Sequence, residues 1–112
     1  MVLRMNEASA ELVDALAREH EVRGAAGGWM TLERPRISPS GGQSVLFDLR
    51  TPDYPELLIT YRHEMSEDMD AGTAAVILTA LVQEMIDTRQ HPTSGRWSFS
   101  QERGYERMAH AD

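Results

Sequence analysis

The strongest constraint on the fold of this 112-residue chain is a helical repeat of apolar residues over positions 70–89. Apolar residues recur there every three or four positions, at Ala74, Ile77, Leu78, Leu81, Val82, Met85 and Ile86. This spacing places them on one face of an α-helix. Ala75, Val76 and Ala80 widen that face beyond the width that one sheet would cover. We therefore expect the helix to lie centrally or to join two copies of the chain through Ala75, Val76 and Ala80.

An earlier helix and three strands are predicted before this helix. The first helix is expected to begin at a cap residue, Asn6 or Ser9, and to end near Glu21. Alternating apolar and polar residues predict three strands, at residues 29–37, 44–50 and 57–63. Short turns rich in Pro, Gly and Ser separate the strands, which indicates antiparallel pairing. Pro35 predicts an edge or a bulge in the first strand.

The order of these elements predicts an α+β fold: a helix, a three-stranded antiparallel meander and a second helix (α-β-β-β-α). Residues 1–89 would form a single acidic domain, followed by an extended polar C-terminal tail at residues 90–112. The tail holds Trp97, Phe99 and Tyr105, although disordered segments are usually poor in aromatic residues. Two interpretations therefore stay open, a strap that docks on the core or on a partner, and disorder.

The composition excludes several kinds of chemistry. The chain has no cysteine, which removes disulfides, thiol nucleophiles and thiolate zinc sites. All eleven basic residues are arginine, so no lysine can form a Schiff base or bind phosphate in a phosphate-binding loop. No serine lies in the G-x-S-x-G context of a hydrolase nucleophile. Arginine in place of lysine fits a GC-rich genome, which suggests an actinobacterium or its phage.

The net charge of −7 lies within residues 1–89, which hold eight arginines against fifteen aspartates and glutamates. An acidic body repels phosphate at long range, so direct nucleic-acid binding is not expected. A protein partner with a basic surface is favoured instead. No apolar run is long enough to cross a membrane, and the N-terminus lacks the pattern of a secretion signal, so we expect a cytoplasmic protein.

The stretch RHEMSEDMDAG, residues 62–72, brings one histidine and four carboxylates together within eleven residues. In one interpretation, His63, Glu64, Glu67 and Asp70 bind a hard metal ion or exchange protons with a substrate. The spacing, however, matches neither an EF-hand loop nor the His-Glu-x-x-His motif. This interpretation therefore rests on proximity in sequence alone.

In the other interpretation, the same stretch begins the long helix. Ser66 or Asp70 would cap the helix N-terminus, while Glu67 and Asp68 would meet the positive end of the helix dipole. This arrangement accounts for three of the four carboxylates without any ligand. We favour it, and we expect no metal and no cofactor.

Four arginines lie on or beside the predicted strands, namely Arg34, Arg36, Arg50 and Arg62. On a shared face they would form a positive strip that could receive an acidic peptide or nucleic acid. We favour instead that they pair with acidic residues of the strands, namely Glu33, Asp48 and Glu64.

These observations favour a non-catalytic domain that binds another protein and regulates it. An acidic inhibitor, such as a phage anti-defence protein or a toxin-immunity protein, would suit this size and charge. The expected partner-binding residues are Glu64, Glu67, Asp68, Asp70, Trp97, Phe99 and Tyr105. The alternative is a small metal-dependent enzyme or module that uses His63 with the acidic cluster. No catalytic residue is assigned, and a homodimer through the long helix is a separate prediction.

Overall fold

The three predicted strands are present, but they form only the middle of a larger sheet. A computed structural model, which describes residues 2–39, 43–66 and 68–108, contains two helices and six strands within those ranges. In chain order they are α1 (Val2–Glu19), β1 (Glu21–Arg23), β2 (Trp29–Ile37), β3 (Ser44–Arg50), β4 (Leu57–Glu64), α2 (Ala71–Thr88), β5 (Gly95–Ser100) and β6 (Gly104–Arg107).

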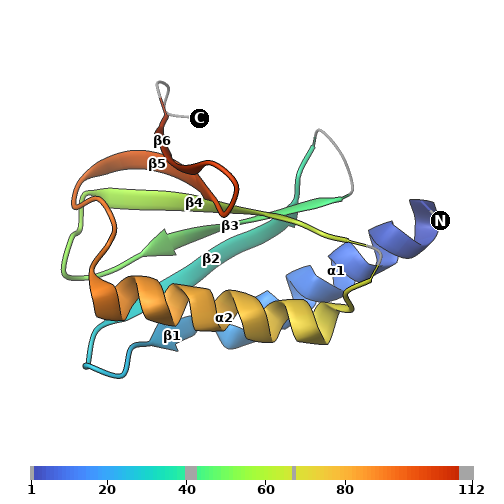
Figure 1. The fold of residues 1–112 in the computed structure, drawn as a ribbon, viewed down its shortest axis with the longest axis horizontal. Helices are drawn as coiled ribbons and strands as arrows, with labels where there is room; N and C mark the ends of the chain where they lie inside the picture. The colour runs from blue at the N-terminus through green and yellow to red at the C-terminus, as the bar shows by residue number, and fades with distance from the viewer. Residues whose placement is uncertain (1, 40–42, 67, 109–112) are drawn as a thin grey trace.

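The strands lie side by side in the order β1 to β6 and form one sheet (Figure 1). β4 and β5 pair in parallel, and every other neighbouring pair is antiparallel. The expected three-stranded meander between two helices is therefore wrong. The fold is α+β with a six-stranded mixed sheet and two helices.

The largest correction concerns residues 95–107, which the sequence predicts as part of an extended tail. They form β5 and β6. After α2 the chain returns to the sheet, so that β5 places Trp97 opposite Ile59 and Phe99 opposite Tyr61 of β4. Gly104 begins β6 with a φ of 70°, in the left-handed region that favours glycine. β5 and β6 have only six and four residues, too few to show a sustained period in the sequence.

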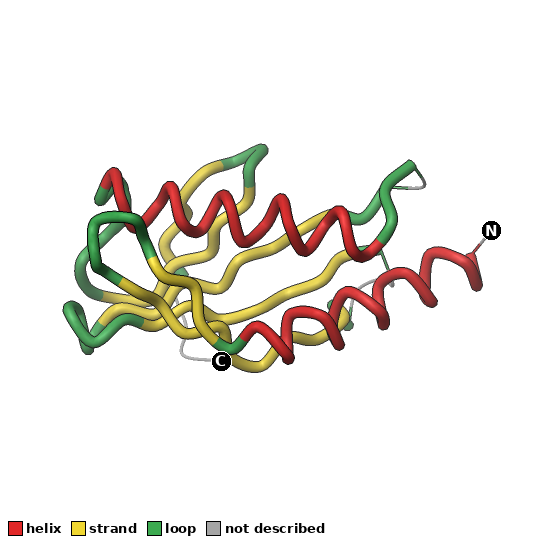
Figure 2. The backbone as a smooth tube through the Cα atoms, turned by 90° about the horizontal axis from the view of Figure 1, so that it is seen from below, coloured by secondary structure: helices red, strands yellow, loops and turns green. Residues whose placement is uncertain are grey.

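Both helices cover the same face of the sheet (Figure 2). They pack against each other and run in the same direction (Figure 1). The core lies between the helices and the sheet, and the residues that β3 and β4 contribute to it are Val45, Phe47, Leu49, Leu57, Ile59 and Tyr61. These residues point inward, as their alternation predicts. The other face of the sheet carries the polar residues of the strands and is covered by neither helix.

The first helix and the segment after it also differ from expectation. α1 starts near the N-terminus, so Asn6 and Ser9 lie inside the helix rather than at its cap. The helix ends before His20, which has a φ of 59°, and the chain then forms the three-residue strand β1. Gln83 of α2 donates a hydrogen bond through Nε2 to the carbonyl of Arg23 at 2.9 Å. This bond holds the short edge strand against α2.

Candidate functional site

Residues 62–64 of the acidic stretch end β4, and the predicted helix cap is confirmed at Asp70. Asp70 is the N-cap residue, and its Oδ1 accepts a hydrogen bond from the backbone N–H of Thr73 at 2.7 Å. This hydrogen bond lowers the pKa of the Asp70 carboxyl. Ser66 is not the cap, Asp68 is exposed, and Glu67 lies outside the described residues. Helix capping thus accounts for Asp70 without a ligand.

His63 and Glu64 point to opposite sides of β4. Glu64 Oε2 accepts hydrogen bonds from Nε of Arg62 at 3.1 Å and from Oγ of Ser44 at 3.0 Å, and these bonds lower the pKa of the Glu64 carboxyl. His63 lies on the inner side, opposite Val45 of β3. Within the described ranges, no group of three or more His, Asp or Glu side chains could hold a metal ion. The described members of the proposed metal cluster do not converge.

A buried carboxylate lies near the centre of the uncovered sheet face. Asp48 is 3% exposed, and its two oxygens lie 3.3 Å from Nη1 of Arg34 and Nη1 of Arg36. It also accepts a hydrogen bond from Oγ1 of Thr60 at 2.9 Å. A register shift in β2, where Arg34 has a φ of 53°, lets both arginines reach the same carboxylate. The bulge predicted at Pro35 is confirmed.

The two remaining arginines predicted to pair are also paired. Nε of Arg50 lies 3.5 Å from Oε1 of Glu33, and Nε of Arg62 lies 3.1 Å from Oε2 of Glu64. Arg62 and Glu64 belong to the same strand, so this pair does not cross strands as expected. Each of the four strand arginines meets a carboxylate, although Arg34 and Arg36 share one, Asp48. The favoured pairing with acidic residues is therefore present.

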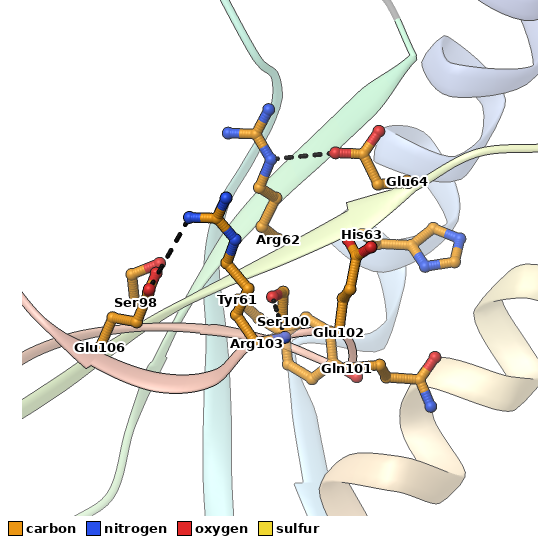
Figure 3. Close-up of a pocket in the computed structure, with 10 residues that line it drawn as sticks. All are labelled: Tyr61, Arg62, His63, Glu64, Ser98, Ser100, Gln101, Glu102, Arg103 and Glu106. Carbon is orange, nitrogen blue, oxygen red and sulfur yellow. Dashed lines mark hydrogen bonds and ion pairs between the residues drawn. The ribbon is translucent and has the colours of Figure 1, made fainter.

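A polar cleft opens where the two parallel strands separate (Figure 3). β4 and β5 remain paired as far as Tyr61 and Phe99, and beyond that point β4 continues to Glu64 while β5 turns into β6. The cleft has a volume of about 550 Å³ and is lined by the ten residues drawn in Figure 3. Ligands of open α/β sheets bind beyond the carboxyl ends of parallel strands, and this cleft has the corresponding position.

Two polar atoms of residues that line this cleft are buried without a hydrogen-bond partner among the described residues. They are the hydroxyl oxygen of Tyr61 and Nε2 of His63. Burial, with a smaller effect from Tyr105, raises the pKa of Tyr61 to about 12, and burial lowers the pKa of His63. Both side chains are therefore uncharged at neutral pH. Alternation along β4 predicts that Tyr61 points inward, but no sequence signal could show that its hydroxyl lacks a partner.

The cleft also contains two serines, Ser98 and Ser100. The ring of His63 points away from both of them (Figure 3). Oγ of Ser100 accepts a hydrogen bond from the backbone N–H of Arg103 at 3.1 Å. A serine nucleophile needs a base within hydrogen-bond reach. The arrangement of the described side chains therefore favours binding over nucleophilic catalysis.

A second cleft, of about 320 Å³, lies between α2 and the inner side of β4, β5 and β6. Phe99 and Tyr105 line it, with ring centroids 4.6 Å apart, and burial raises the pKa of Tyr105 to about 12. Trp97 does not line it. The indole Nε1 of Trp97 donates a hydrogen bond to the carbonyl of Ser94 at 2.8 Å. Two of the three aromatic residues predicted to bind a partner thus line a cleft.

The outward side of α2 exposes apolar residues, including part of the predicted dimer interface. Val76 is 69% exposed and Ile77 is 37% exposed. Ala80 is exposed as well, and Ala75 is half-buried. The apolar arc of α2 is therefore wider than the sheet covers, as the sequence predicts.

The exposed side of α1 carries three acids, followed by Arg18 in the last turn. Glu7, Glu11 and Asp14 are exposed at helical spacing, and none of them forms an ion pair within the described ranges. Because α1 and α2 are packed together, the acids of α1 and the apolar residues of α2 belong to one helical layer. We call this surface the acidic–apolar face: Glu7, Glu11, Asp14, Val76, Ile77 and Ala80.

These features define a small α+β domain with both helices on one face of a mixed sheet and a cleft at the carboxyl ends of its parallel strands. Comparison of the chain with protein-family models, with curated proteins and with solved structures finds no match. No helix in the described part of the chain is long and apolar enough to span a membrane.

Proposed function

We propose that this chain is a non-catalytic domain that binds another protein through the acidic–apolar face and thereby regulates it. The unequal charge of the two sides of the molecule supports the proposal. On the uncovered sheet face, arginines neutralise the carboxylates. On α1, the three acids of the acidic–apolar face have no ion pair among the described residues. Carboxylates that form no ion pair among the described residues thus lie in the same helical layer as exposed apolar side chains.

This combination suits a protein partner with a basic surface and an apolar spot within it. Full burial of a side chain such as Val76 contributes about 1.5–3 kcal/mol to association. Carboxylates around the apolar residues attract a basic partner at long range and speed its encounter. Regulation would follow because the bound domain occupies the partner's basic surface. An acidic inhibitor, such as a phage anti-defence protein or a toxin-immunity protein, is the form of regulation that we favour.

The test begins with affinity capture from a GC-rich bacterial lysate at low salt, using the whole chain as bait, and identification of the captured protein by mass spectrometry. Affinity for that protein is then measured by calorimetry. The double variant Glu11→Gln/Asp14→Asn and the single variant Val76→Ser should each weaken binding about tenfold, which corresponds to about 1.4 kcal/mol.

The matched control is Asp53→Asn/Glu56→Gln, which removes the same two charges from exposed positions in the β3–β4 loop. This control should bind like the unchanged protein. Equal weakening in both double variants would mean that net charge alone governs binding, and would contradict a defined interface. Recovery of no partner at low salt would contradict the proposed function.

A second copy of the chain could cover the same residues, as the predicted homodimer requires. Light scattering distinguishes this case from the proposed one. A dimer that Val76→Asp converts to a monomer would assign the face to self-association, and a monomer at all concentrations would remove the homodimer. The proposed regulatory function predicts the monomer.

A further inference from the structure

The two clefts share residues, so they form adjoining parts of one depression. Tyr61 and Gln101 line both the polar cleft and the α2 cleft. The α2 cleft has apolar walls, from Leu81 and Met85 on the helix and from Phe99 on the sheet. Ligand-binding clefts typically have volumes of about 300–1,000 Å³ and combine apolar walls with a few polar groups. The two volumes here, about 320 and 550 Å³, fall in that range.

Of the two unpartnered atoms, one belongs to Tyr61, which lines both clefts, and the other belongs to His63, which lines the polar cleft only. Tyr61 is 1% exposed, and its hydroxyl has no hydrogen-bond partner among the described residues. His63 lies two residues further along the same strand and on the same side of the sheet, about 7 Å away. Buried hydroxyl and imidazole groups are normally hydrogen-bonded, and a ligand in an adjoining cleft is one way to satisfy them.

The character of these groups limits which ligand fits. Burial keeps the phenol of Tyr61 protonated and the imidazole of His63 uncharged at neutral pH. Neither can form an ion pair inside the depression. The two arginines of the polar cleft, Arg62 and Arg103, are paired with Glu64 and Glu106. Glu84 and Glu102, which have no ion pair among the described residues, would repel an anion. The walls are aromatic, with Phe99 set edge-on to Tyr61 at 5.0 Å, an arrangement that a further ring can extend.

We propose that this depression binds a small, uncharged aromatic ligand that carries a hydrogen-bonding group. The ring packs between Met85 and Phe99, and the polar group meets the hydroxyl of Tyr61 and Nε2 of His63. The site is separate from the acidic–apolar face, so it does not depend on the proposed regulatory function.

Three probes of nearly the same shape test the proposal: benzamide, which is neutral, benzoate, which is an anion, and benzamidine, which is a cation at neutral pH. Each is titrated into the ¹⁵N-labelled whole chain and followed by NMR. Benzamide should give saturable shifts at the backbone amides of Leu81, Phe99 and Gln101. Benzoate and benzamidine should bind at least about tenfold more weakly, because their charged groups would lose water beside the buried groups of Tyr61 and His63, which carry no charge to pair with them.

Tyr61→Phe keeps the ring and removes the hydroxyl, and it should weaken benzamide binding about tenfold. Tyr54→Phe removes a tyrosine hydroxyl outside both clefts and should leave binding unchanged. A measurement on the unchanged protein serves as a second test, because benzamide should also shift the ring nitrogen signals of His63.

Three results would overturn the proposal. The first is the absence of saturable shifts with benzamide, which would mean that water alone satisfies the buried groups. The second is equal affinity for benzamide in the unchanged protein and in Tyr61→Phe with unmoved His63 signals. The third is equal affinity for benzoate or benzamidine, which would contradict selection for an uncharged ligand.

Discussion

At Tyr61 the ring and the hydroxyl group meet different surroundings. The ring stacks on Phe47, with centroids 4.9 Å apart and an interplanar angle of 13°. The hydroxyl is buried without a partner among the described residues. A packed aromatic pair contributes about 0.5–1.5 kcal/mol beyond its area, whereas a buried hydroxyl without a hydrogen bond costs about 1–3 kcal/mol. The ring, and not the hydroxyl, therefore holds Tyr61 in the core.

Tyr61→Phe is expected to raise the free energy of unfolding by about 1 kcal/mol, because it keeps the stacked ring and removes the unpaired hydroxyl. Urea unfolding of the two proteins measures the difference. Tyr54→Phe is the control, since Tyr54 is only half-buried. A clear loss of stability in Tyr61→Phe would show that the hydroxyl forms a hydrogen bond in solution.

His63 gives the protein a dependence on pH. Burial lowers the pKa of its imidazole from 6.5, while neighbouring Glu64 opposes this shift. The folded protein therefore takes up this proton less readily than the unfolded chain. The stability contributed by neutral His63 is present above pH 6.5 and is lost as the pH falls below it.

Urea unfolding at several values between neutral pH and about pH 5 should show this loss, and His63→Gln should remove it. The lowered carboxyl pKa values of Glu64 and Asp70 affect stability only when the pH falls below their ordinary values of 4.5 and 3.8. The two effects therefore occupy different pH ranges. A stability that does not change over the higher range would contradict the burial of a neutral imidazole.

Among the elements, α2 is the one whose start and end follow most directly from its sequence. Its predicted range, residues 70–89, differs from the observed one by a single residue at each end. Asp70 closes the N-terminus, and Arg89 closes the C-terminus with a φ of 56° and a backbone hydrogen bond to the carbonyl of Met85. Both ends are therefore fixed by local contacts.

Asp70→Ala should lower the melting temperature because it leaves the backbone N–H of Thr73 without its acceptor. Asp68→Ala removes the same charge two positions earlier in the chain, at an exposed residue that does not cap the helix, and should have a smaller effect. Thermal unfolding followed by circular dichroism compares the two variants. Equal effects would mean that charge near the helix dipole matters more than the capping hydrogen bond.

The bulge in β2 concentrates two arginines on one buried carboxylate. Asp48→Asn keeps the shape of the side chain but weakens its bonds to Arg34, Arg36 and Thr60, and we expect a loss of about 1–3 kcal/mol in the free energy of unfolding. Glu33→Gln removes a partner from a largely exposed ion pair and should cost less than about 1 kcal/mol. Chemical unfolding of both variants measures the contrast. A similar cost in both would mean that Asp48 is hydrated in solution.

Elements set by local periodicity could be predicted, and elements set by distant pairing could not. β2 and β3 have the predicted bounds, because alternating apolar residues define a strand buried on one side. β1 and β6 have three and four residues, and β5 has its partner in β4, across the whole of α2. The candidate site could be predicted only in part, for the same reason. The sequence predicts the cap at Asp70 correctly. The clefts depend on β5 and β6, which the sequence does not predict.

At the scale of the whole molecule, the sheet depends on residues beyond the predicted 1–89 domain. β5 covers the edge of β4 and supplies Trp97 and Phe99 beside Ile59 and Tyr61. Ile59 is fully buried and Tyr61 is 1% exposed in the complete sheet. Without β5, the edge of β4 would lose its backbone partners, and an unpaired strand edge promotes aggregation.

A chain shortened to residues 1–89 should therefore fail to fold into the native structure. We expect poor amide dispersion in its NMR spectrum and a tendency to aggregate, in contrast to the full chain. A chain that ends at residue 108 is the control and should fold like the full one, since β6 ends at Arg107. A well-dispersed, monomeric spectrum for residues 1–89 would mean that β5 and β6 are dispensable for folding.

The parallel pairing of β4 with β5 has a consequence during protein synthesis. The ribosome completes β4 well before β5, because residues 65–94 lie between the two strands. At roughly 5–20 residues per second, translation of that segment takes a few seconds. During this delay β3 can already pair with one edge of β4, but the other edge of this hydrophobic strand stays unpaired in the nascent polypeptide. That edge would make the nascent polypeptide a natural substrate for a chaperone.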